Sequence, residues 1–189
     1  MAGLVNKRNR HLYIAPSSKP KSKVMKRATH FDMMDILKLL FRVKLNMEEK
    51  GQSFWDKTYP TREDIEEALK SKGVFLYYEY DILKGMFVRS RKIPKYLRNV
   101  VFKNTKKPVY LSKLCVHPKY RRRGHGSNIL DFVLRYAALN KFDSIRCSVD
   151  RDQKIMIKML ENFGFKRKKK LVEFRGRKHI VYELLLEEE

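Results

Sequence analysis

The stretch of sequence that decides the fold is Leu111-Ser-Lys-Leu-Cys-Val-His-Pro-Lys-Tyr-Arg-Arg-Arg-Gly-His-Gly126. An apolar, strand-like run ends at Pro118, three arginines follow, and two glycines separated by one residue lead into an amphipathic segment. Glycines let the backbone approach a ligand closely, and the first turn of a helix presents free N–H groups and a positive dipole end. Arginine side chains add paired hydrogen bonds to phosphate oxygens. The order of these features predicts an anion-binding turn between a strand and a helix.

This turn does not have the pattern of the common nucleotide-binding loops. A P-loop requires Gly-x-x-x-x-Gly-Lys-Ser/Thr, and a Rossmann turn requires Gly-x-Gly-x-x-Gly. Here Gly126 is followed by Ser127, Asn128 and Ile129, so neither pattern is completed. The anion that binds here is therefore expected to belong to a different class of ligand.

Arg121-Arg122-Arg123-Gly124-His125-Gly126 resembles the Arg/Gln-x-x-Gly-x-Gly/Ala signature of the GNAT superfamily, the acetyl-CoA-dependent N-acyltransferases. Val116-His117-Pro118 ends the preceding strand, and Phe163-Gly164-Phe165 ends a later helix, as in that family. Phe54-Trp55-Asp56-Lys57-Thr58-Tyr59-Pro60 is similar to the Trp-Asp-x-x-Tyr-Pro segment of many bacterial members. The resemblance covers roughly residues 23–187.

The resemblance implies an α/β fold, a single domain whose mixed central sheet is flanked by helices on both faces. A length of 189 residues suits one domain, and an apolar fraction of 43% is enough for a core. Residues 1–22 are basic, small and broken by prolines, and they are expected to form a flexible N-terminal arm before the GNAT-like domain at 23–189.

Hydrophobic periodicity and turn signals predict the individual elements. The second helix has Thr61 as its N-cap and Gly73 at its end. Helices are expected at 32–47, 62–72, 127–140 and 153–162, and strands at 23–28, 74–80, 85–90, 109–116, 144–149, 165–174 and 178–186. Strands that alternate with helices in this way are typical of an α/β sheet.

The resemblance also implies acetyl-CoA as the acyl donor and assigns residues to it. The pyrophosphate would lie on the turn formed by Arg121, Arg122, Arg123, Gly124, His125, Gly126 and Ser127. The strand before the turn, at Leu114, Cys115 and Val116, would lend backbone groups to the pantetheine arm and the thioester oxygen. Gln153 occupies a position where the family often has an asparagine that contacts the cofactor. We expect His117 at the strand end and His125 facing solvent.

The sequence departs from the family where a tyrosine often protonates the leaving thiolate. Leu160 occupies that position and cannot donate a proton. The thiolate could leave unassisted or take a proton from water, another residue could serve, or catalysis could be lost. Ser148 and Asp150, at the end of a predicted strand, are the candidate catalytic residues, with Asp150 a base if burial raises its pKa. Ordinary strand-end and helix-cap roles are the alternative.

Trp55 and Tyr59 lie between the first two helices, in a region that borders the acceptor site in the family. They are candidate substrate-side residues. The alternative is that both side chains close the hydrophobic core over those helices.

The net charge of +23 is concentrated in three bands of sequence. Residues 1–30 and 82–107 contain no acid, and residues 166–178 contain Glu173 alone among eight basic residues. Such bands attract polyanions, so association with RNA or the ribosome is one interpretation and a solvated lysine-rich surface is the other. Aromatic residues among the lysines of 91–107 fit either a binding loop or an ordinary connection whose aromatics pack inward.

Cysteine and hydropathy patterns exclude some classes of protein. Cys115 and Cys147 lack metal-ligand spacing and fall on predicted strands, so we expect two buried reduced thiols and no metal site. No apolar run approaches the roughly 20 residues of a membrane span, and the first thirty residues have no secretory h-region. A cytoplasmic protein with no membrane partner is expected.

These observations predict an N-acetyltransferase that moves an acetyl group directly from acetyl-CoA to a primary amine. The acceptor could be a protein, a small molecule or an RNA-linked amine. The alternative is a catalytically silent acyl-CoA-binding or RNA-binding module on the same fold, which Leu160 motivates. A metabolite-modifying enzyme with an incidental basic surface is a third interpretation.

Overall fold

The computed structural model describes residues 12–13, 23–103 and 106–186. The predicted arm at 1–22 lies outside these ranges except for Leu12–Tyr13, which form a short strand β1 paired with β2. The described strands form one sheet with the order β1-β2-β3-β4-β5-β6-β8-β7. Their bounds are β2 Lys23–Arg27, β3 Val74–Glu79, β4 Ile82–Ser90, β5 Pro108–Val116, β6 Ser144–Asp150, β7 Lys166–Phe174 and β8 Arg177–Leu185.

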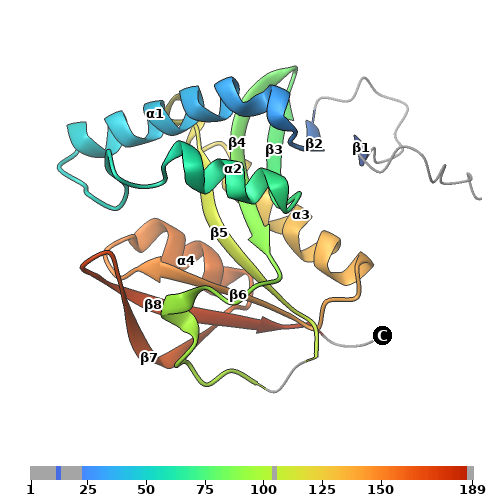
Figure 1. Ribbon diagram of the computed structural model, residues 1–189, viewed down its shortest axis with the longest axis vertical. Helices are drawn as coiled ribbons and strands as arrows, with labels where there is room; N and C mark the ends of the chain where they lie inside the picture. The colour runs from blue at the N-terminus through green and yellow to red at the C-terminus, as the bar shows by residue number, and fades with distance from the viewer. Residues whose placement is uncertain (1–11, 14–22, 104–105, 187–189) are drawn as a thin grey trace, which may run out of the picture.

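Helices cover both faces of this sheet (Figure 1). The first pair, α1 (Met33–Glu49) and α2 (Arg62–Lys70), packs its apolar side chains on β3, β4 and β5. The second pair, α3 (His125–Leu139) and α4 (Lys154–Asn162), contributes to the core on the opposite face. The single-domain α/β architecture with a mixed sheet is therefore confirmed.

The predicted elements all form, with shifted ends. Thr61 caps α2 as predicted, because its hydroxyl accepts the N–H of Asp64 while the Asp64 carboxylate accepts the N–H of Thr61. The shift that matters for the anion turn is in α3, which begins at His125 and not at Ser127. The second glycine of the signature is thus the second residue of the helix, so the anion turn and the helix overlap.

The only parallel pair in the described sheet, β5 and β6, is also where the sheet opens. Its ladder runs from Pro108↔Ser144 to Leu111↔Cys147 and goes no further. Beyond Leu111, β5 bulges against β4, and Lys113 takes a left-handed backbone conformation with φ 51°. A bulge bends its strand, so the carboxyl-terminal halves of β5 and β6 separate and leave backbone edges between them.

The described part of the basic segment that precedes β5, residues 91–103, packs across the sheet face that carries β6, β7 and β8. It contains a short 3-10 helix, η2 (Lys95–Leu97), and its side chains Leu97 and Val100 are buried against Val172 and Val181. Tyr96 and Phe102 pack against the same cluster. The inward-packing interpretation of these aromatics is therefore confirmed.

A buried ion pair fastens this segment to the sheet. Arg146 on β6 donates to Glu183 on β8 (3.0 Å) and to the carbonyl of Lys103 (2.8 Å). The Arg146 guanidinium also lies over the Phe102 ring, 4.3 Å from its centroid. These contacts fix the course of 91–103 and so hold Tyr96 in place over β6.

Both cysteines are buried and free, as predicted. Burial raises the pKa of each thiol to about 12, so neither is a thiolate nucleophile at neutral pH. Among the described residues, no helix has the length and apolar character to cross a bilayer, and no group of side chains has the makeup of a metal site.

Candidate active site

The predicted anion turn lies between β5 and α3 and is built mainly from backbone. Gly124 caps α3 in the left-handed region (φ 81°), and Arg122 is also left-handed (φ 59°). Left-handed residues alternating with ordinary ones turn successive N–H groups toward one side, which makes a concave anion-binding surface. The N-terminus of α3 adds its dipole to the same place.

The three arginines of the turn differ in their contacts. Arg122 and Arg123 are exposed and available to a ligand. The Arg121 side chain is half-buried, donating from Nε to the carbonyl of Val116 (3.2 Å) and from Nη1 to Oδ1 of Asn46 on α1 (2.8 Å). Arg121 therefore connects the turn to β5 and α1, whereas Arg122 and Arg123 are exposed.

His125 does not face solvent, and that expectation was wrong. Because α3 begins at this residue, its side chain points into the core and is 4% exposed. Its Nε2 lies 3.8 Å from Glu79, and its Nδ1 has no hydrogen-bond partner among the described residues. Burial lowers the pKa of His125, with Glu79 partly opposing this and Lys84, Lys23 and Arg123 adding to it.

The residues predicted to meet the pantetheine arm lie along the opening between β5 and β6. Leu114 lines the cavity at this opening, whereas the Cys115 side chain is buried. The Val116 carbonyl accepts a hydrogen bond from Arg121 Nε, and the Cys115 carbonyl faces Gly85 of β4. Gln153 lines the cavity too, but as the N-cap of α4 and not within the helix as predicted. His117 ends β5 as expected and caps the short helix η3 (Pro118–Tyr120).

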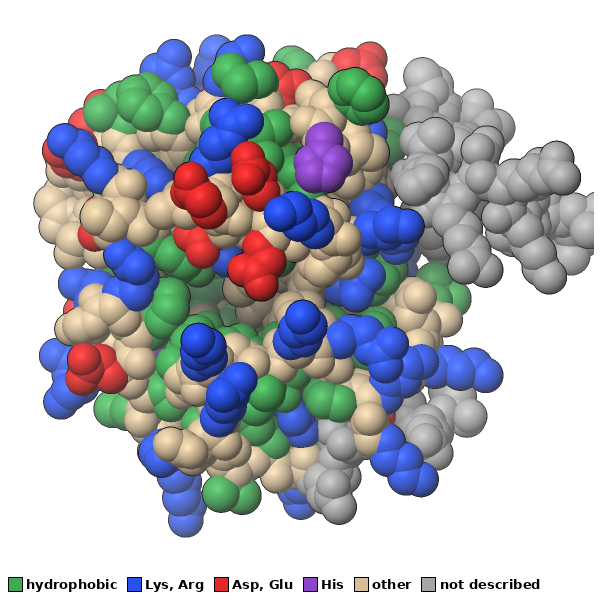
Figure 2. All heavy atoms as spheres, viewed as in Figure 1, with side chains coloured by type: hydrophobic (Ala, Val, Ile, Leu, Met, Phe, Trp, Pro, Cys, Tyr) green, Lys and Arg blue, Asp and Glu red, His purple; other side chains and the backbone are tan. Residues whose placement is uncertain are grey.

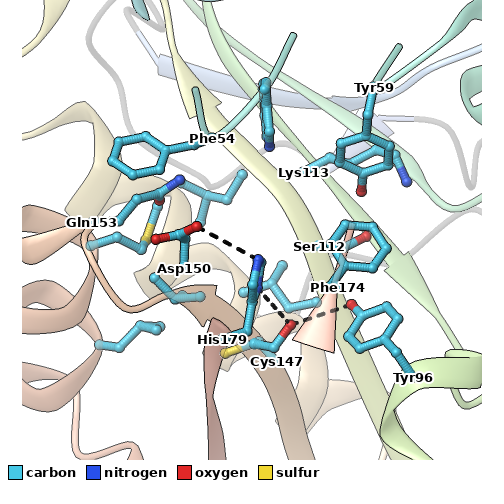
Figure 3. A pocket seen from close by; sticks show the side chains of 17 residues that line it. Phe54, Tyr59, Tyr96, Ser112, Lys113, Cys147, Asp150, Gln153, Phe174 and His179 are labelled. Atoms are coloured by element: carbon cyan, nitrogen blue, oxygen red, sulfur yellow. Dashed lines mark hydrogen bonds and ion pairs between the residues drawn. The ribbon is translucent and has the colours of Figure 1, made fainter. Parts of the chain in front are cut away.

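A cavity opens at the point where the β5–β6 ladder ends (Figure 3). Its floor contains Ser112, Ser148 and Asp150 from the two strands, and Figure 3 shows Gln153 next to Asp150. The predicted site residues Trp55, Tyr59, Leu114, Ser148, Asp150 and Gln153 all line it. The cavity thus brings together residues as far apart in sequence as Phe54 and His179.

Aromatic side chains form much of the cavity wall. Tyr59 packs edge-on against Phe174 (5.1 Å between centroids), and Phe174 packs on Tyr96 (4.5 Å). Trp55 lines the cavity and also packs against the core of α1 and α2, as the alternative interpretation of this residue predicted. Sequence reasoning missed Phe54, Tyr96 and Phe174, because isolated aromatics carry no spacing signal that points to a cavity.

The turn between β7 and β8 closes over this wall. Arg175 donates to the Thr58 hydroxyl and lies over the Tyr59 ring (5.3 Å), and Arg177 donates to the Ser53 hydroxyl (3.0 Å). Segment 53–59 and the β7–β8 turn are more than a hundred residues apart in sequence. Their contact encloses one side of the cavity.

Lys113 is a half-buried cation that lines the cavity, and sequence reasoning also missed it. Its bulged backbone directs the side chain toward Tyr59, with Nζ 5.2 Å from the ring centroid. Burial lowers the pKa of Lys113, and the acids Asp64 and Glu67 on α2 oppose that shift.

Asp150 was predicted to act as a base if burial raised its pKa, and that condition is not met. Burial pushes its pKa upward, but hydrogen bonds from Arg177 and from the N–H of Asp152 outweigh it, and the pKa is lowered. The carboxyl is 2% exposed and ion-paired with Arg177. Asp150 is therefore ionised but a weak base, which suits it to orienting a neighbour.

His179 on β8 is a further titratable group that sequence reasoning missed. It pairs directly across the antiparallel ladder from Asp150, and its Nδ1 lies 3.5 Å from Ser148 Oγ. Ser148 Oγ also lies 3.3 Å from the Tyr96 hydroxyl. The signal that could have found His179 is the register of β6 against β8, because pairing the two predicted strands antiparallel would have placed His179 opposite Asp150.

Leu160, at the position where the family often has a tyrosine, lies in hydrophobic surroundings. Leu160 is 1% exposed, and with Met156 it lines the end of the cavity nearest α4. Cys147 also lines the cavity, with its pKa raised by burial. Among the described residues of α4, Met156 and Leu160 line the cavity, and neither side chain can donate a proton.

Opposite charges face each other across the cavity mouth. In Figure 2 a hollow lies below α2, with acidic side chains gathered over the helix and basic side chains over η2 on the other side. The acids of α2 are Glu63, Asp64, Glu66 and Glu67. A cationic amine group that entered here would meet the acids of α2 on one side of the mouth and the lysines and arginines of 91–98 on the other side.

The comparisons with known proteins agree with this geometry. Residues 43–165 match the model of the acetyltransferase (GNAT) family. The chain is 28% identical to a spermine/spermidine N(1)-acetyltransferase from Bacillus subtilis over 141 residues, 74% of this chain and 88% of that protein. It is 37% identical to a mycothiol acetyltransferase from Saccharomonospora viridis, but over only 33% of this chain and 19% of that protein.

Solved structures share the fold over almost their whole length. A GNAT acetyltransferase from Streptococcus agalactiae has a TM-score of 0.77 at 15% identity, covering 89% of this chain and 98% of that chain. The acetyltransferase YncA from Salmonella typhimurium, solved with its cofactor acetyl-CoA, has a TM-score of 0.66 at 14% identity over 89% and 96% of the two chains.

This chain belongs to the acetyltransferase (GNAT) family. It is an acetyl-CoA-dependent N-acyltransferase. The residues present fit the cofactor, because the concave turn of N–H groups, Arg122 and Arg123 suit a pyrophosphate and the opened edge of β5 suits an extended amide chain.

Proposed function

We propose that this protein transfers an acetyl group directly from acetyl-CoA to a primary amine held in the aromatic cavity. The pyrophosphate binds the turn from Arg122 to Ser127, and the pantetheine arm follows β5 past Leu114. The observation that carries the proposal is the end of the β5–β6 ladder at Leu111↔Cys147, because the opening connects the anion turn to the cavity. Holding thioester and amine in one opening supplies the proximity that the reaction needs.

When bound, acetyl-CoA supplies an activated acyl group with a thiolate leaving group. The protein's part is to bind and orient the two reactants and to take a proton from the acceptor, since a protonated amine is not a nucleophile. Backbone N–H groups near the β5 bulge are placed to stabilise the thioester oxygen. Ser148 and Asp150 lie on the acceptor side of the cavity, where proton transfer is needed.

The cavity favours an unbranched alkyl amine over a bulky aromatic amine. Tyr59, Phe174 and Trp55 give flat apolar walls, and the acids of α2 attract an ammonium group at the mouth. The Bacillus subtilis relative acts, by its name, on spermine and spermidine, which are such amines. Spermidine is therefore the first acceptor to test, beside a peptide with a free α-amine and a lysine side chain.

A two-stage measurement tests this proposal. Calorimetry on nuclease-treated, high-salt-washed protein should show acetyl-CoA binding in the micromolar range, about −8 kcal/mol. Release of free thiol from acetyl-CoA should then depend on added spermidine or peptide. Binding without amine-dependent thiol release for any of these acceptors would favour a silent acyl-CoA-binding module; absence of binding would defeat the proposal.

A second candidate function concerns the basic surface. The fold brings two of the three basic bands together, because η2 lies against β7 and Lys170 donates to the Asn99 carbonyl (3.0 Å). This surface borders the cavity through Tyr96 and Phe174. We propose that it binds the phosphate backbone of an RNA that carries or lies near the acceptor amine, within the cytoplasm.

The salt dependence of binding tests the RNA proposal. Binding of a labelled RNA should weaken linearly with log salt, with a slope that reports the number of phosphates contacted. Replacing Lys168, Lys169 and Lys170 by glutamine should make the slope shallower. A flat salt response, or an unchanged slope in the variant, would remove RNA as the partner of this surface.

A further inference from the structure

Four polar side chains from three elements converge in the cavity (Figure 3). Tyr96 comes from η2, Ser148 and Asp150 from β6, and His179 from β8. Ser148 Oγ lies 3.3 Å from Tyr96 Oη and 3.5 Å from His179 Nδ1, and His179 Nε2 lies 4.0 Å from Asp150 Oδ2. They lie in the order Tyr96–Ser148–His179–Asp150, with hydrogen-bond distances on both sides of Ser148 and an ion-pair distance between His179 and Asp150.

The fold explains why these residues meet. Asp150 and His179 are directly paired in the antiparallel β6–β8 ladder, and Ser148 is two residues before Asp150. Residues two apart on a strand share a face, so all three side chains lie on the face that segment 91–103 covers. Leu97, buried against that face, places the neighbouring Tyr96 over Ser148.

Hydrogen-bonding chemistry gives this order a direction. An ionised carboxylate only accepts, so the imidazole nitrogen nearest Asp150, Nε2, carries the proton. The other nitrogen, Nδ1, is then an acceptor that faces Ser148. A hydroxyl has one proton, and rotation about the C–O bond redirects it. In this structure Ser148 Oγ is the donor to Tyr96 Oη; when Ser148 instead donates to Nδ1, it accepts a hydrogen bond from the Tyr96 hydroxyl.

The charged surroundings of His179 keep the imidazole neutral. It faces Asp150 on β6, Arg177 on β8, Tyr96 on η2 and the ring of Phe174 on β7. Burial lowers the pKa of His179, Asp150 partly opposes this, and Arg177 lowers it further. Burial also raises the pKa of Tyr96, so its phenol stays protonated and keeps donating.

We propose that Ser148 and His179 together take the proton from the acceptor's ammonium group, with Asp150 stabilising the imidazolium and Tyr96 fixing the Ser148 hydroxyl. This inference rests on the proposed function. It gives a role to Ser148 and Asp150 that neither could fill alone, because a serine is not a base and Asp150 is held by Arg177.

The proton steps balance as follows. The ammonium passes one proton to Ser148 Oγ while Ser148 passes its own to His179 Nδ1, which leaves a neutral amine and an imidazolium. The amine lone pair forms the N–C bond to the thioester carbonyl, and the C–S bond breaks with its electron pair on sulfur. The attacking nitrogen gives one of its two remaining protons to the departing thiolate and keeps the other in the amide, and the imidazolium returns its proton to solvent.

The kinetic test compares His179→Gln and Ser148→Ala with His117→Gln, a histidine outside the cavity. With spermidine or peptide acceptor, kcat should fall about a hundredfold in the first two variants, while KM and acetyl-CoA affinity change little. The wild-type rate should drop as pH falls below the ordinary imidazole pKa of 6.5, and this acid limb should vanish in His179→Gln. An unchanged acid limb, or full activity, overturns the proposal.

A measurement that needs no acceptor keeps the inference separate from the proposed function. Nitrogen-15 NMR of histidine-labelled protein should show His179 as the Nε2–H tautomer at neutral pH, and Ser148→Ala should shift Nδ1 selectively. The opposite tautomer, or no response to Ser148→Ala, overturns the proposed interaction of Ser148 with His179 even if the enzyme is active. Acetyl-Ser148 in the mass spectrum after acetyl-CoA addition would also overturn it, because Ser148 would then be a nucleophile.

If the wild type binds acetyl-CoA but acetylates no tested amine, the proposed function fails and the NMR result alone decides the interaction of Ser148 with His179. If the wild type is active and the His179→Gln variant equals it, the proposed function stands and the inference fails.

Discussion

The two sides of the β5–β6 opening are built in different ways. On the cofactor side, one continuous run of sequence forms the anion turn, and the binding groups are backbone N–H groups. On the acceptor side, side chains from at least five separate segments meet, and almost nothing in the wall comes from backbone alone. The first side is local in sequence, and the second exists only when the sheet has formed.

This difference predicts different sensitivities. A backbone site tolerates most side-chain changes and fails when a new Cβ or charge occupies its space. A side-chain site tolerates changes in backbone detail and fails when one functional group is removed. The four predictions below test this contrast, in order of decreasing effect.

Gly124→Glu should have the largest effect, a loss of acetyl-CoA affinity of about a hundredfold, roughly 3 kcal/mol. Gly124 has φ 81°, and a Cβ added to it would have no atom within 4 Å. A glutamate there would therefore act through its charge and through backbone strain, and not through a steric clash. Calorimetry measures the loss. Gly51→Glu is the matched control, with φ 63° and equally open space. Equal losses in both variants would show that strain, not the site, is responsible.

Gly85→Ala should destabilise the protein by about 3 kcal/mol in urea unfolding. A Cβ there would lie 2.5 Å from the carbonyl oxygen of Cys115, which is backbone of the strand that borders the opening. Gly126→Ala is the control, because its nearest contact is the flexible Met159 sulfur at 3.1 Å. If Gly126→Ala lowers the free energy of unfolding as much as Gly85→Ala does, the close contact between the β4 and β5 backbones is not the cause of the loss.

Lys113→Met tests the acceptor side. Removing a half-buried cation next to Tyr59 should relieve repulsion of an incoming ammonium group and lower KM for spermidine about tenfold, with acetyl-CoA affinity unchanged. Steady-state kinetics beside Lys119→Met, an exposed lysine on η3, would measure it. A rise in KM would instead indicate that the acceptor carries an anion that Lys113 binds.

His125→Leu should have the smallest effect, visible only in acid. Because burial lowers the pKa of His125, the unfolded chain binds more protons than the folded one once pH falls below 6.5. Stability of the wild type should therefore decrease as pH falls from 7 to 5, and less so in His125→Leu. Thermal unfolding midpoints across this range give the comparison, and parallel curves for the two proteins would rule out His125 as the titrating group.

The sequence by itself determined the fold class and the anion turn. Elements with strong local signals, such as the Thr61 cap of α2 and the apolar stripe of α3, form where the sequence predicts them. The glycine pattern before α3 needs only neighbouring residues, so sequence reasoning could find it without knowing the rest of the molecule. Its one wrong detail, the orientation of His125, depends on a helix start two residues earlier than expected.

Only the tertiary structure decided the acceptor side. Lys113 enters the cavity because β5 bulges, His179 meets Ser148 because β6 and β8 pair in one register, and Tyr96 covers them because Leu97 is buried. These are contacts between residues distant in sequence, and each depends on strand register and packing, which no local pattern encodes. Local backbone propensity fixes a turn, whereas a pocket of side chains is fixed by how separate elements pack.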